Sequence, residues 1–347
     1  MYAHQGKMNQ SRIASVDLAK GICISIVMLF HIKGIIQDDC VLSPVLFSAC
    51  MLPPFYFLSG LFFKEEKTMR LFLLKKVNKL LIPFAFFYLA TSVIIPNLLH
   101  FVWGMQFETV VGWPSLWAFV WPGEYPNFPI WFLWCLFVMN LLFWAIHYCS
   151  KQCFPHSKFA AIAVLSIGCG CLGFYAETVF DTDIANLFEA MKSIPLFAFG
   201  YLSAQVDVLA RLESASGLKK AACLLLSFFV SLLSCCSFAD NLAWMDLLVY
   251  YVYGTAGISL ILIVSTLIVR LPLISYLGRY SIIVLLSHGL LARLGYQHFV
   301  NLSASIGQYG AVILFWLLMA FSYLVIIPLF RRFLPHVTGQ APLLKVL

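Results

Sequence analysis

The sequence predicts an all-α, polytopic membrane helix bundle with about ten transmembrane helices and both termini in the cytoplasm. Hydrophobic residues make up 62% of the 347 residues, charged residues only 11%, and the mean hydropathy is +0.92. A soluble domain could not bury that much apolar surface. The second observation is the regular recurrence of long apolar runs, and the third is the uneven distribution of basic residues between alternate loops.

The apolar runs define the expected spans. A helix needs about 20 residues to cross a hydrocarbon core ~30 Å thick. The first run is too long for the core of a signal peptide, so we interpret it as a retained helix. By this criterion we expect spans near residues 13–36, 42–63, 80–102, 128–149, 159–176, 190–207, 219–238, 246–268, 279–299 and 309–330.

Lysine and arginine set the orientation, because cytoplasmic loops carry an excess of both. With a cytoplasmic N-terminus, nearly all of the basic residues fall inside, and only Lys33, Lys192 and Arg293 fall on the outer side. We therefore expect a multi-pass protein of the cell (inner) membrane. It would have an N-terminal tail at 1–12, a membrane domain at 13–331 and a cytoplasmic C-terminal tail at 332–347.

The first span contains ionisable residues that a purely spanning helix does not need: Asp17, Lys20 and His31. Ionisable groups at membrane depth are costly and usually face the interior of a bundle, where they mark a site. At about 100° per residue, these side chains share one face, and Lys20 and His31 lie about 16 Å apart along the axis. A structural alternative is an i,i+3 pair of Asp17 with Lys20 at one helix end and an interfacial His31 at the other.

A basic residue followed by ten residues and a histidine, here Lys20 and His31, resembles the first helix of the membrane acyltransferase family called acyltransferase 3. Ser59 and Gly60 in PPFYFLSGLFF resemble the family's apolar-Ser-Gly motif, although a small pair also suits helix packing alone. Lys76 and Lys79 before a proline resemble its basic loop. Cations at the cytoplasmic end of a helix can bind the phosphates of coenzyme A or the head groups of anionic lipids.

Two further stretches extend the resemblance. Trp131 opens a Trp-Phe-Leu stretch within an aromatic-rich segment, which is typical of an interfacial belt but could also form a platform for a sugar ring. Arg279 and His288 belong to LGRYSIIVLLSHGLL, which resembles the family's late motif. His288 is a polar group within a span and needs a partner, so it is either structural or lines the site.

The resemblance implies transfer of an acyl group, commonly acetyl, from a cytoplasmic acyl-CoA such as acetyl-CoA to a hydroxyl of an envelope glycan or lipid-linked saccharide. His31 would be the general base, because the unperturbed pKa of histidine is about 6.5, and the alternative role for it is a transient acyl carrier. Lys20 would stabilise charge on the donor side, and Asp17 would set the charge state of Lys20. Ser59, Gly60, Trp131 and His288 would bind substrate, while donor phosphates would contact Lys76, Lys79 and Arg279.

Other functions remain open at this stage. The main alternative function is an exporter or flippase of a polysaccharide or lipid-linked sugar. A third is a receptor or scaffold in which the polar residues only hold the helices together. The eleven cysteines are scattered through apolar runs and are typical of small hydrophobic side chains, so no metal is expected. Membrane lipids are expected partners and nucleic acid is not. Self-association is compatible with the sequence.

Overall fold

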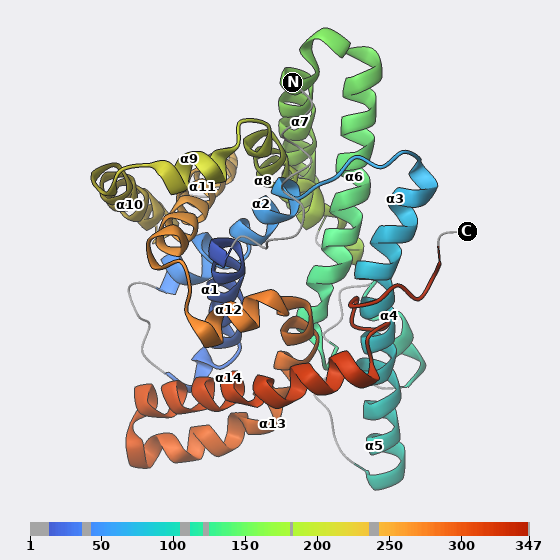
Figure 1. The fold of residues 1–347 in the computed structure, drawn as a ribbon. Coiled ribbons are helices and arrows are strands. Elements are labelled where there is room, and N and C mark those ends of the chain that lie inside the picture. Colours follow the sequence, from blue (N-terminus) through green and yellow to red (C-terminus); the bar gives the residue numbers. More distant parts are fainter. Residues whose placement is uncertain are drawn as a thin grey trace.

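The computed structural model describes residues 14–36, 43–104, 112–120, 125–180, 183–235 and 243–345. Within these ranges the chain is helical, with no strand (Figure 1). The first half contains α1 (Ala14–Phe30), α2 (Pro53–Leu61), α3 (Met69–Lys76), α4 (Ile82–Tyr88), α5 (Ile95–Trp103), α6 (Trp131–Cys153) and α7 (Lys158–Val179). The second half contains α8 (Leu187–Gln205), α9 (Val208–Ser214), α10 (Gly217–Ser231), α11 (Ala243–Ile268), α12 (Pro272–Arg279), α13 (Ser281–Ile306) and α14 (Gln308–Phe333).

Each expected span contains a helix, and the all-helical fold class is therefore confirmed. In the described part of the chain, six helices are long and apolar enough to cross a membrane, and up to eight if each of two bent pairs forms one span. The count of ten and the cytoplasmic termini stay predictions. Large apolar side chains such as Leu218 and Phe101 are 83% and 72% exposed, as expected for surfaces that face lipid. The expected N-terminal tail, residues 1–12, lies outside the described residues.

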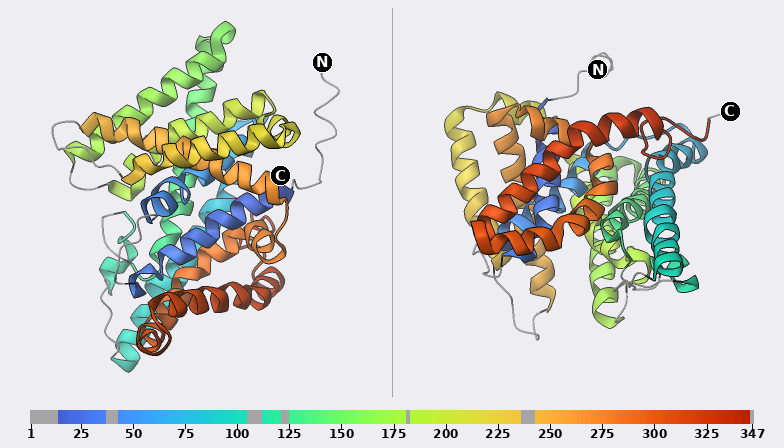
Figure 2. Two further views of the ribbon diagram at one scale, coloured as in Figure 1. Left: turned by 90° about the vertical axis from the view of Figure 1, so that its left-hand side faces the viewer. Right: turned by 90° about the horizontal axis from the view of Figure 1, so that it is seen from below.

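Helix α1 lies in the interior of the bundle and packs against α11, α12 and α13 (Figures 1 and 2). Its contact with α12 is a backbone-to-backbone crossing. A Cβ at Gly278 would overlap the carbonyl oxygen of Asp17 and the backbone of Gly21, and a Cβ at Gly21 would overlap the carbonyl of Ile274. Glycine permits such close approach of two helices in a membrane. This crossing fixes the helix that carries Lys20 and ends directly before His31.

The segment that resembles the family's basic loop is helical. The Thr68 hydroxyl accepts a hydrogen bond from the backbone N–H of Leu71 at 3.2 Å and so caps the start of α3. Helix α3 then continues through the π-helical segment η3 (Val77–Leu81) into α4. Pro83 lies in the first turn of α4, where it cannot donate a backbone hydrogen bond, and the wider π turn accommodates this. A basic π turn is thereby placed directly beside the interior of the bundle.

A second irregularity separates α12 from α13. Their axes differ by 98°, and the chain turns at Tyr280. Because α12 ends at Arg279 and α13 begins at Ser281, the break exposes the basic C-terminal turn of one helix and the N-terminal end of the next. Both ends point to the same interior space, which is lined by residues of α1, α2, η3 and α6 as well.

Candidate active site

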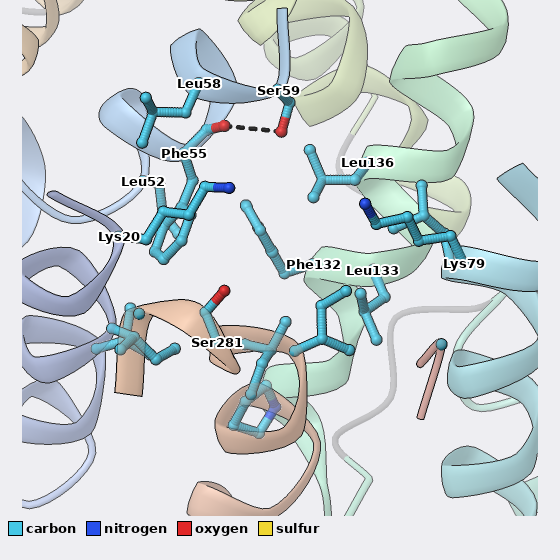
Figure 3. A pocket seen from close by; sticks show the side chains of 18 of the residues that line it. Lys20, Leu52, Phe55, Leu58, Ser59, Lys79, Phe132, Leu133, Leu136 and Ser281 are labelled. Carbon is cyan, nitrogen blue, oxygen red and sulfur yellow. Dashed lines mark hydrogen bonds between the residues drawn. The ribbon is translucent and has the colours of Figure 1, made fainter. Parts of the chain in front are cut away.

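The interior space next to α1 is a cavity of about 580 Å³, here called the lysine cavity. Its walls come from segments that are far apart in the sequence. Figure 3 shows Lys20 and Lys79 extending toward it from opposite sides, with Ser59 and Ser281 between them. The predicted site residues that line it are Lys20, His31, Ser59, Lys76, Lys79, Trp131 and Arg279.

Charge within this lining is of one sign. Lys20 and Lys76 are partly buried, whereas Lys79 and Arg279 are exposed. The Lys20 ammonium lies 5.3 Å from the ring centre of Phe62, and the Lys76 ammonium lies 5.4 Å from that of Phe72, so aromatic faces help to stabilise both cations. The lining residues in the described part of the chain include no aspartate or glutamate. The cavity therefore suits a ligand with negative groups at one end.

The remainder of the wall is mostly apolar, with Leu58, Phe132, Leu133 and Leu136 among its members (Figure 3). Asn140, one helical turn from Leu136 on α6, contributes a polar atom that sequence reasoning missed. Its Nδ2 donates to the Leu136 carbonyl at 2.7 Å, while its buried Oδ1 has no hydrogen-bond partner among the described residues. A ligand N–H could satisfy this oxygen, because an unpaired buried acceptor is costly.

A second cavity of about 570 Å³ begins where the lysine cavity ends. We call it the tyrosine cavity. It was not predicted, although a regular α-helical spacing on α13 is a signal that could have indicated it. Its lining comprises His31, Tyr125, Pro126, Phe128, Pro129, Gly289, Ala292, Arg293, Tyr296 and Gln297.

His31 lies where the two cavities meet. It directly follows the last residue of α1 and lines both cavities, as do Phe128 and Pro129. Its ring centre is 5.0 Å from that of His288, and the two ring planes form an angle of 59°. The sequence placed Lys20 and His31 on one helix face, and the structure brings both to one cavity. It adds a second histidine beside the first.

His288 has a defined tautomer. Its Nδ1 lies 3.0 Å from the carbonyl oxygen of Val284 and 3.1 Å from that of Leu285. Carbonyls only accept hydrogen bonds, so Nδ1 carries the proton and Nε2 presents a lone pair. Nε2 is buried and has no partner among the described residues, and the same is true of Oη of Tyr125 and of Oδ1 of Asn127, whose Nδ2 donates to the Leu286 carbonyl at 2.9 Å. Buried polar atoms normally have a hydrogen-bond partner, so each of these atoms is available to a water molecule or a polar ligand.

Three of the predicted site residues, Asp17, Gly60 and His288, do not line the lysine cavity. Gly60 packs against the backbone of Phe197 on α8. Ser59 lines the cavity, but its hydroxyl donates to the Phe55 carbonyl at 2.8 Å, so that it offers lone pairs to a ligand (Figure 3). Substrate roles for Gly60 and His288, and a charge-setting role for Asp17, stay predictions.

No group of three or more histidine, cysteine, aspartate or glutamate side chains with metal-binding geometry occurs in the described ranges.

Comparison with known proteins gives one match. A family model described as an acyltransferase domain, that of the acyltransferase 3 family, matches residues 13–331. The curated proteins and the solved structures contain no match to the chain.

Proposed function

Because the chain belongs to the acyltransferase 3 family, and is thus a multi-pass membrane acyltransferase, we propose that it O-acetylates an envelope glycan or lipid-linked saccharide. The donor is acetyl-CoA on the cytoplasmic side of the inner membrane. The proposal rests on one observation above all: His31 lines two separate cavities, one with four cations and one lined by tyrosine, glutamine and arginine side chains. Two substrates that enter from opposite sides would meet at this imidazole.

The lysine cavity suits the donor. Coenzyme A combines phosphates with a long arm that contains amides and ends in the thioester. The exposed Lys79 and Arg279 would contact phosphates at the mouth, and Lys76 lies deeper. The arm would follow the apolar wall, where the unpaired Asn140 Oδ1 can accept an amide N–H. Lys20, on the helix that ends next to His31, is positioned to stabilise negative charge on the thioester oxygen during attack.

The tyrosine cavity suits the acceptor, because its polar side chains can exchange hydrogen bonds with hydroxyl groups. His31 removes the proton of the acceptor hydroxyl as its oxygen bonds to the acyl carbon. The carbon–sulfur bond then breaks, and the proton is delivered to the departing thiolate, which gives the ester and free coenzyme A. His288 is buried and lines neither cavity, so it would act by positioning the His31 imidazole, whose ring centre is 5.0 Å from its own.

Vesicles of known orientation test this function. Acetyl-labelled CoA is supplied on the side of the lysine cavity and saccharides from a cell envelope on the other side. Label on saccharide together with free thiol is the expected result. Saccharide flux without thiol release would instead favour the exporter, and thiol release with label only on the donor side would refute transfer across the membrane.

A further prediction concerns the affinity for CoA of variants at three neighbouring lysines of one helical segment. Lys76→Gln and Lys79→Gln should each weaken CoA binding about tenfold, since hydrogen bonds to charged groups contribute more than neutral ones. Lys75→Gln is the matched control, because Lys75 pairs with Glu66 at 2.7 Å and does not line the cavity. Calorimetric titration with CoA measures all three. Equal affinities for the three variants would exclude the lysine cavity as the donor site and favour lipid binding by these residues.

A further inference from the structure

The chain does not leave the bundle after α14. Residues 334–344, here called the C-terminal strap, fold back beside α3 and α4 (Figure 1). The strap has its own internal hydrogen bonds, from the N–H of Thr338 to the Leu334 carbonyl at 3.1 Å and from the N–H of Gln340 to the Pro335 carbonyl at 2.9 Å. Thr338 is fully buried. The segment is therefore an ordered part of the fold.

One buried side chain anchors the strap. The Oδ1 of Asn78 accepts the backbone N–H groups of Leu343 and Leu344, at 2.7 and 2.8 Å. Its Nδ2 donates to the Leu344 carbonyl at 3.0 Å and to the carbonyl of Leu74, in its own helix, at 2.8 Å. Asn78 is only 8% exposed, and each of its polar atoms is used twice. It lies in the π turn between Lys76 and Lys79.

The strap also forms part of the lysine cavity, because Gly339 and Gln340 belong to the lining together with Lys76 and Lys79. Gly339 has a φ of 66°, a conformation that favours glycine. A Cβ at this position would lie 3.0 Å from the Lys79 carbonyl oxygen. In a regular α-helix this carbonyl would accept a hydrogen bond from the backbone N–H of residue 83. Pro83 has no N–H, so the carbonyl lacks that bond. The irregular turn thus leaves room for the strap at the cationic mouth.

We propose that the C-terminal strap closes the donor site over Lys76 and Lys79, and that Asn78 is a positioning residue that acts through the strap. The inference rests on the proposed function and extends it. The strap packs on the turn that carries Lys79 and supplies the adjoining part of the cavity wall, so that strap and cations together would hold the phosphate-bearing end of the donor. The thioester lies at the other end of the cavity, so the strap should affect donor affinity and leave the chemical step nearly unchanged.

The test uses a chain that ends at Phe333, the Asn78→Ala variant, and both changes combined. Each single change should raise the KM for acetyl-CoA and the Kd for CoA about tenfold, with kcat within about twofold of the wild type. The combined variant should be no worse than the truncation, because residues that act through one contact are not additive. Melting temperatures of the detergent-solubilised variants show that each is folded.

Asn97→Ala is the matched control. Asn97 also donates to a carbonyl in its own helix, that of Val93 at 2.7 Å, and to a separate segment at Ser115, but it lines neither cavity. Its KM should be that of the wild type. Additive effects of truncation and Asn78→Ala, or a truncation with unchanged Kd, would overturn the strap proposal. If CoA does not bind even the full chain, the proposed function fails, and the strap proposal fails with it.

Discussion

Replacement of His31 by alanine should lower kcat for acyl transfer by about 10²–10⁴-fold, the usual contribution of a positioned general base. The Kd for CoA should change little, because His31 lines the lysine cavity at its junction with the tyrosine cavity, whereas the donor-phosphate candidates Lys79 and Arg279 are exposed at the mouth. Single-turnover measurements of labelled product, with CoA titration of the same preparations, separate the two effects. His31→Ala protein that retains full transfer activity would remove this residue from the mechanism.

Two comparisons make the experiment specific. His298→Ala is the matched control, since His298 is exposed on α13 and lines neither cavity, and its activity should equal that of the wild type. His288→Ala should lose less activity than His31→Ala, because His288 lines neither cavity and would only position the His31 ring. The opposite order would assign the base to His288, whose ring centre is only 5.0 Å from that of His31.

The sequence predicts the helices well because the bilayer imposes a length on each apolar run. It predicts their irregularities poorly. The π turn at Val77–Leu81 and the 98° break at Tyr280 depend on how Pro83 and the crossing of α12 with α1 are accommodated, and a window of apolar residues contains no such information. The same irregularities bring Lys79 and Arg279 to one cavity.

The candidate site, too, could be predicted from the sequence only in part. Lys20 lies in α1 and His31 directly follows its last residue, so helical periodicity was sufficient to group them. The tyrosine cavity instead joins Tyr125 to Arg293, Tyr296 and Gln297 of α13, and this pairing is a tertiary contact that one sequence does not specify. Positions 289, 292, 293, 296 and 297 do follow the i, i+3, i+4, i+7, i+8 spacing of one helix face, which is the signal that could have identified them.

Gly278→Val, at the crossing of α12 with α1 beside the lysine cavity, should damage both the fold and the activity. The added Cβ would overlap the Asp17 carbonyl and the Gly21 backbone, and no side-chain rotation can relieve a clash with backbone. Overpacking of this kind typically costs about 1–3 kcal/mol or more. Because α1 carries Lys20 and ends directly before His31, its displacement should also lower activity, and a misplacement of 1 Å can cost about 10²-fold. Melting temperature in detergent and acyl transfer measure the two effects.

Gly168→Ala provides the contrast, because a Cβ at Gly168 in α7 would meet nothing within 4 Å. There the added methyl should leave activity unchanged and the melting temperature equal or slightly higher, since alanine favours a helix over glycine by about 1 kcal/mol. A Gly278→Val protein that melts and reacts like the wild type would mean that α12 does not cross α1 at this point. It would also remove the basis for placing Arg279 and Lys20 in one cavity. The glycine at this crossing therefore tests the geometry on which the whole candidate site depends.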